Sequence, residues 1–69
     1  MKKQGNNQAS IVLEHLKKHQ SITPISAFML YHIFRLAPRI YDLRSQGWVI
    51  ETSIQRGPTG LKYAKYILK

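Results

Sequence analysis

Residues 35–52 read RLAPRIYDLRSQGWVIET, and the first part of this stretch has the pattern of a helix. Leu36, Ile40 and Leu43 recur at intervals of four and three, which places them on one helical face. Arg35, Arg39, Asp42 and Gln46 lie to one side of this face. The pattern therefore predicts a third helix over residues 34–46 with one buried stripe.

The rest of the stretch marks the ends of this helix. Pro38 is compatible with a helix only in its first turn, where a missing N–H costs nothing, so we expect the helix to start near Arg35. Gly47 stands where a glycine commonly ends a helix. The following residues, 48–54, are rich in aromatic and β-branched types and predict a strand.

The N-terminal half of the sequence predicts two further helices. Residues 8–19 carry apolar side chains at helical spacing, namely Ala9, Val12, Leu13 and Leu16. Residues 20–22 are expected to break this helix. Thr23 and Pro24 then have the types preferred at the N-cap and first position of a second helix, which should end at residue 30 or 31. Its expected core residues are Ile25, Phe28 and Met29.

The C-terminal residues predict the second strand of a hairpin. Residues 55–60 are rich in Gly, Pro and Thr and are typical of a turn. Residues 61–68 alternate, with Ala64, Tyr66 and Leu68 on one face. Three helices followed by a β-hairpin form an α+β winged helix-turn-helix, in which the third helix projects outward.

Composition narrows the functional classes. The 69 residues include 11 Lys and Arg but 3 Asp and Glu, which gives a net charge of +8. A small basic domain most commonly meets nucleic acid, and an anionic membrane surface comes second. The sequence has no cysteine, and its few carboxylates are scattered over different elements. We therefore expect no enzyme, no cofactor and no metal site, although His15 and His19 share a helix face.

The charge and hydropathy of the chain also suggest its organisation. Residues 1–7 are expected to form a flexible basic arm, and residues 8–69 a single domain. No apolar run approaches the ~20 residues that span a bilayer, and no apolar signal region follows the basic start. We expect a cytoplasmic protein that does not bind a membrane, in a bacterial or phage-infected cell.

Residues 33–44 and 47–52, together with residues 21–27, resemble a family of small winged helix-turn-helix domains common in phage, prophage and plasmid proteins. The resemblance extends over residues 11–68, and its most specific part is the run from Arg35 to Arg44 followed by Gly and an aromatic residue. It implies DNA binding. The chain differs from the family at Phe34, where a capping Thr or Ser is frequent, and at Pro38, where Ala is usual.

Within this fold, the candidate DNA-contacting residues lie on the second helix, the third helix and the hairpin tip. They are Thr23, Ser26, Arg35, Pro38, Arg39, Asp42, Arg44, Arg56, Thr59 and Lys62. Arginine on an exposed helix is suited to guanine and phosphate, and a glycine-rich tip lets backbone approach phosphate. Each has a structural alternative: Arg35 or Arg39 could pair with Asp42, Arg44 could pair with Glu51, and Thr23 could act only as a cap.

Two hypotheses about function follow. In the first, the protein binds double-stranded DNA as a small phage or mobile-element transcriptional regulator, or as an architectural recombination directionality factor, and gains affinity as a homodimer or cooperative oligomer. In the second, it is a protein-interaction module that modulates host transcription or defence through a host protein partner. Stacking of single-stranded bases on Tyr41 and Tyr63 is a further alternative.

Overall fold

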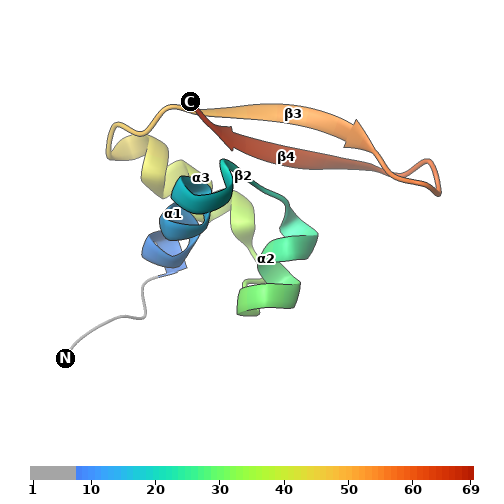
Figure 1. Ribbon diagram of the computed structural model, residues 1–69, viewed down its shortest axis with the longest axis horizontal. Coiled ribbons are helices and arrows are strands. Elements are labelled where there is room, and N and C mark those ends of the chain that lie inside the picture. Colours follow the sequence, from blue (N-terminus) through green and yellow to red (C-terminus); the bar gives the residue numbers. More distant parts are fainter. Residues whose placement is uncertain (1–7) are drawn as a thin grey trace.

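The computed structural model describes residues 8–69 and has the predicted α+β arrangement (Figure 1). The elements, in chain order, are α1 (Gln8–His19), β2 (Ser21–Ile22), α2 (Pro24–Tyr31), α3 (Leu36–Ser45), β3 (Ile50–Arg56) and β4 (Lys62–Leu68). Figure 1 shows the helices below one side of the β3–β4 hairpin, whose tip extends beyond them. The arm expected for residues 1–7 lies outside the described residues.

One apolar core joins the helices to the sheet. On α1 it contains the predicted stripe, with Val12 and Leu16 fully buried. On α3 it contains Leu36, Ile40 and Leu43, so the predicted buried stripe is confirmed. Among residues 8–69, no helix is long and apolar enough to cross a membrane.

The sheet has three antiparallel strands in the order β2-β4-β3, with β4 in the centre. The expected break at residues 20–22 forms the short strand β2, in which Ser21 lies opposite Ile67. A two-residue strand is too short to show a periodic pattern. Its hydrogen-bond partners in β4 are also distant in the sequence, so the local residues do not indicate it. Strand β3 also starts two residues later than predicted, at Ile50.

Helix α2 begins as predicted but buries a different face. Thr23 is its N-cap and Pro24 its first residue. Ile25, Phe28 and Met29 are exposed, so their assignment to the core was wrong. The buried residue is Ala27. Almost every residue of α2 is apolar, so periodicity could not identify the inner face, and the small side chain of Ala27 is the one that meets the core.

Helix α3 starts at Leu36, one residue after the predicted start. Pro38 therefore lies in the first turn, where its missing N–H has no helical acceptor to satisfy. At the other end, Gly47 has a φ of 104° and its N–H donates to the carbonyl oxygen of Arg44. The predicted glycine stop is confirmed, because only glycine adopts this φ without strain.

Candidate functional site

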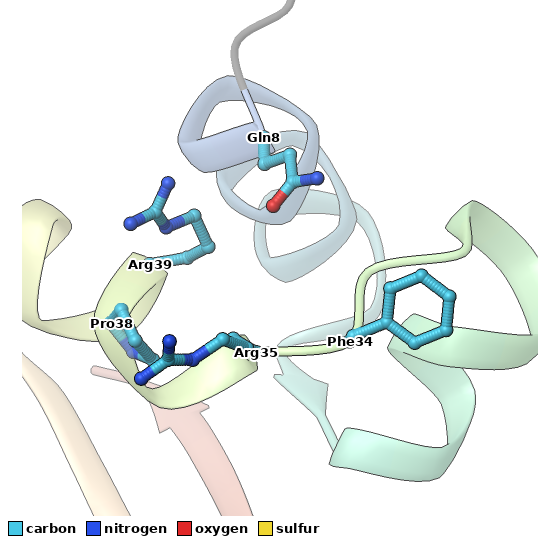
Figure 2. A pocket seen from close by; sticks show the side chains of 5 residues that line it. All are labelled: Gln8, Phe34, Arg35, Pro38 and Arg39. Carbon is cyan, nitrogen blue, oxygen red and sulfur yellow. The ribbon is translucent and has the colours of Figure 1, made fainter.

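The N-terminus of α3 borders an open cleft of about 390 Å³. The cleft is lined by Gln8, Phe34, Arg35, Pro38 and Arg39. Figure 2 shows the two guanidinium groups and the Gln8 amide arranged around the same opening. The start of α1 and the start of α3 meet here, and both helix N-termini carry partial positive charge. The cleft is therefore suited to an anionic ligand.

Two residues of α3 fix the position of this cleft. Leu36 and Ile40 are buried in the core and hold the first turn of α3 against α1. Arg35, at the N-cap, makes no side-chain capping hydrogen bond and is exposed. The first-turn N–H groups of α3 thus have no side-chain cap, and the guanidinium of Arg35 is available to a ligand.

Arg39 is partly engaged inside the protein. Its Nη2 lies 3.4 Å from Oδ2 of Asp42, one turn along the helix, so the alternative that paired an arginine with Asp42 holds for Arg39. Its Nε is buried and has no hydrogen-bond partner within residues 8–69. Because both side chains remain about one-third or more exposed, the pair contributes little to stability. Arg35 is the more exposed of the two cleft arginines.

The outward face of α3 includes residues that the sequence analysis gave other roles or omitted. Tyr41, named there only for base stacking, is 72% exposed and lies opposite the buried stripe. Ser45 is also exposed and donates a hydrogen bond to the carbonyl oxygen of Tyr41. With Pro38, these residues follow the spacing of three and four along one face. These three positions lie about half a helical turn away from the buried stripe, so the sequence alone could have identified them as the outward face.

Arg44 has a structural role that the sequence analysis did not anticipate. Its Nε and Nη2 donate to the carbonyl oxygen of Ile50 at 3.0 and 2.6 Å, and Nη2 also donates to Oγ1 of Thr52. The alternative that paired Arg44 with Glu51 was wrong, because Glu51 instead pairs with Lys69 at 3.3 Å. Because side chains alternate along β3, Glu51 points to the opposite face of the sheet from Thr52, which Arg44 contacts.

The hairpin tip brings two cations together. Arg56 and Lys62 are direct partners in the register of β3 and β4. Like charges opposite each other destabilise a hairpin, and a bound anion would relieve that repulsion. The turn between them contains the exposed Thr59 and Gly60, whose φ of 87° suits glycine.

The hydroxyl groups at the start of α2 are used by its cap. Oγ1 of Thr23 accepts from the Ser26 N–H, and Oγ of Ser26 accepts from the Thr23 N–H. Thr23 also lines a second groove, together with Thr59 and Lys62 of the hairpin. Six of the candidate residues thus form two groups: Arg35, Pro38 and Arg39 line the cleft at the start of α3, and Thr23, Thr59 and Lys62 line the groove between α2 and the hairpin tip. Arg44 belongs to neither.

His15 of α1 packs against both His19 and Tyr31. His15 is buried, and its Nδ1 lies 2.8 Å from the Tyr31 hydroxyl. Burial lowers the pKa of His15, the neighbouring His19 lowers it further, and a hydrogen bond with the backbone of Ser21 opposes both. Within residues 8–69, no group of three His, Asp or Glu side chains could hold a metal ion.

Comparisons with known proteins give one match. A family model described as a winged helix-turn-helix domain matches residues 7–69, which is nearly the whole chain. No curated protein and no solved structure matches the chain. Three helices followed by a small antiparallel sheet, as described above, are consistent with a winged helix.

Proposed function

Because the chain belongs to the winged helix-turn-helix domain family, we propose that it binds double-stranded DNA, with α3 in the major groove and the hairpin as a wing on the phosphates. Winged helix-turn-helix domains are DNA-binding modules, and a charge of +8 on 69 residues suits that role. We further propose that the protein acts in the cytoplasm as a small phage or mobile-element transcriptional regulator.

The cleft at the start of α3 carries this proposal. It combines two arginines, an uncapped helix start and the N-terminus of a second helix in one open site. Such a combination favours a phosphate or the acceptor-rich edge of guanine. In this arrangement Arg35 contacts a base edge or a phosphate, and Tyr41, further along α3, faces the same major groove of the DNA.

The hairpin tip supports the same proposal independently. Arg56 and Lys62 repel each other in the free protein, and phosphate oxygens between them would remove that repulsion. We further propose that the protein binds without catalysing a reaction; its carboxylates Asp42 and Glu51 form partly exposed ion pairs with Arg39 and Lys69.

A binding selection from random duplex DNA at fixed salt concentration tests the proposal. Enrichment of a motif is expected, since a helix that reads base edges discriminates by about 1–3 kcal/mol per good contact. Binding without enrichment would replace specific regulation by an architectural role. Absence of duplex binding would contradict the proposal.

Two matched variants connect the result to α3. Arg35→Ala and Lys18→Ala each remove one exposed positive charge, from the cleft and from α1 respectively. Arg35→Ala should weaken binding to the enriched motif by roughly tenfold or more, since one specific contact is worth about 1–3 kcal/mol. Lys18→Ala should have a much smaller effect. Equal losses in both variants would mean that only net charge matters.

A further inference from the structure

A continuous apolar surface covers the outer side of α2. Ile25 and Met29 are one turn apart on this side and are both largely exposed. Phe28 lies beside them, and its ring centroid is 5.2 Å from that of Phe34 in the loop before α3. We call these four residues the α2 face. A small monomeric domain gains nothing from exposing so many large apolar side chains.

The α2 face continues into the groove below the hairpin tip. This groove has a volume of about 490 Å³ and is bordered by Ile25 on one side and by residues 57–59 and 61–63 on the other. Leu61 and Tyr63 are its exposed apolar members on the hairpin. The surface therefore combines projecting side chains with an adjacent recess.

The area of this surface is close to what a stable interface needs. The exposed fractions of the α2 face, Leu61 and Tyr63 add up to nearly four whole residues. At about 200 Å² for each large side chain, this is on the order of 700 Å². Two such surfaces would bury about 1,400 Å², within the range of specific protein interfaces.

The near absence of charged side chains on this surface limits which partner can bind it. Helix α2 has no charged side chain, and Lys62 is the one charged residue among those that line the groove. DNA gains little on the α2 face itself, because an uncharged helix offers phosphate no charged partner. An acidic protein would likewise prefer the arginines at the start of α3. A second copy of this +8 chain, in contrast, can approach here with the least repulsion.

We propose that a second copy of this chain docks on the α2 face and its groove, forming a two-fold dimer. In a two-fold interface the same patch serves both partners, so projections and recess must lie on one face, as they do here. Met29 of each copy enters the groove of the other, between α2 and the hairpin tip. Residue Arg35 and the outward face of α3 carry none of this contact.

Sedimentation velocity of the DNA-free protein over a wide concentration range tests the dimer. The wild-type protein should dimerise, and Met29→Lys should weaken dimerisation by about 100-fold or more, because each dimer buries the residue twice. Val49→Lys is the control. It adds the same charge at a residue of similar exposure, 66% against 70% for Met29, at the opposite end of the hairpin.

The control should dimerise as the wild type does, and circular dichroism should show both variants folded. An isotope-filtered NOE between the Met29 methyl group of one copy and Leu61 or Tyr63 of the other is expected in mixed samples. A wild-type protein that stays monomeric would overturn the proposal. So would equal effects of the two substitutions, or no effect of either. Because the protein is measured without DNA, a failure to dimerise is distinguished from a failure to bind DNA, which is measured separately.

Discussion

The guanidinium of Arg44 on α3 holds the carbonyl oxygen of Ile50 through two hydrogen bonds, of 3.0 Å from Nε and 2.6 Å from Nη2. Ile50 is the buried first residue of β3. The contact therefore joins the end of the outward helix to the start of the hairpin. It fixes the angle between the two elements that are proposed to contact DNA.

Arg44→Ala should destabilise the fold by about 1–3 kcal/mol, since the Ile50 carbonyl oxygen loses a charged donor and is too buried for full hydration. Chemical denaturation measures this change. Arg35→Ala is the matched control, because that side chain is exposed and makes no capping bond, and it should change stability by less than about 0.5 kcal/mol. Equal stability of the two variants would contradict the structural role of Arg44.

The cap of α2 predicts a second stability effect. Thr23→Ala removes the hydroxyl that accepts from the Ser26 N–H and should cost about 0.5–2 kcal/mol. Thr23→Ser keeps the hydroxyl and should remain within a few tenths of the wild type. Thermal unfolding of the wild type and the two variants measures these differences in stability. A full loss in the serine variant would show that the methyl group, and not the cap, is important.

The burial of His15 predicts a pH dependence of stability. Its pKa is lowered in the folded protein, so the unfolded chain, with the ordinary value of 6.5, binds a proton more readily. The contribution of neutral His15 to the free energy of unfolding is complete above about pH 6.5 and is lost as the pH falls toward the lowered pKa. The free energy of unfolding should therefore decrease on acidification over this window.

Two histidine variants separate this effect from general acid destabilisation. His15→Gln removes the titrating group, and its stability should fall less with acidification than that of the wild type. His32→Asn changes an exposed histidine at a left-handed position, which asparagine tolerates, and should keep the wild-type dependence. If both variants had the same pH profile, His15 would not be the responsible group.

Tyr41 predicts a contribution from the outward face of α3 to DNA affinity. Its side chain is largely exposed and makes no contact with the core, so Tyr41→Ala should leave stability within about 0.5 kcal/mol. On the enriched duplex the affinity should fall by roughly three- to tenfold, the size of one modest contact. Fluorescence anisotropy with the enriched and a scrambled duplex measures it. Unchanged affinity would remove Tyr41 from the interface.

The sequence predicted those elements whose apolar spacing is unambiguous. Leu36, Ile40 and Leu43 form a stripe with Arg39 and Asp42 along one side, so the pattern indicated which helical face is buried. Helix α2 has no such contrast, and its sequence did not distinguish the buried Ala27 from the exposed Met29. Tertiary packing selected the inner face, because a small residue fits where α2 meets the core.

The same limit applies to the candidate site. The sequence placed Arg35 and Arg39 at the start of α3, and both line its cleft. It could not show that Gln8 would lie beside them, since residues distant in sequence meet only when α1 packs on α3. Nor could it foresee that Arg44 would bond to Ile50, because a backbone carbonyl acceptor leaves no pattern in a sequence.

The salt dependence of duplex affinity, measured for wild type and Arg35→Ala, tests the account most directly. For an interface of about six phosphate contacts, affinity is expected to fall roughly 10³-fold between about 50 and about 200 mM salt. Loss of Arg35 should reduce the logarithmic slope by about one if it contacts phosphate, or lower affinity for the enriched motif alone if it contacts a base. A salt-independent affinity, or no change in either quantity on substitution, would contradict DNA binding through the start of α3.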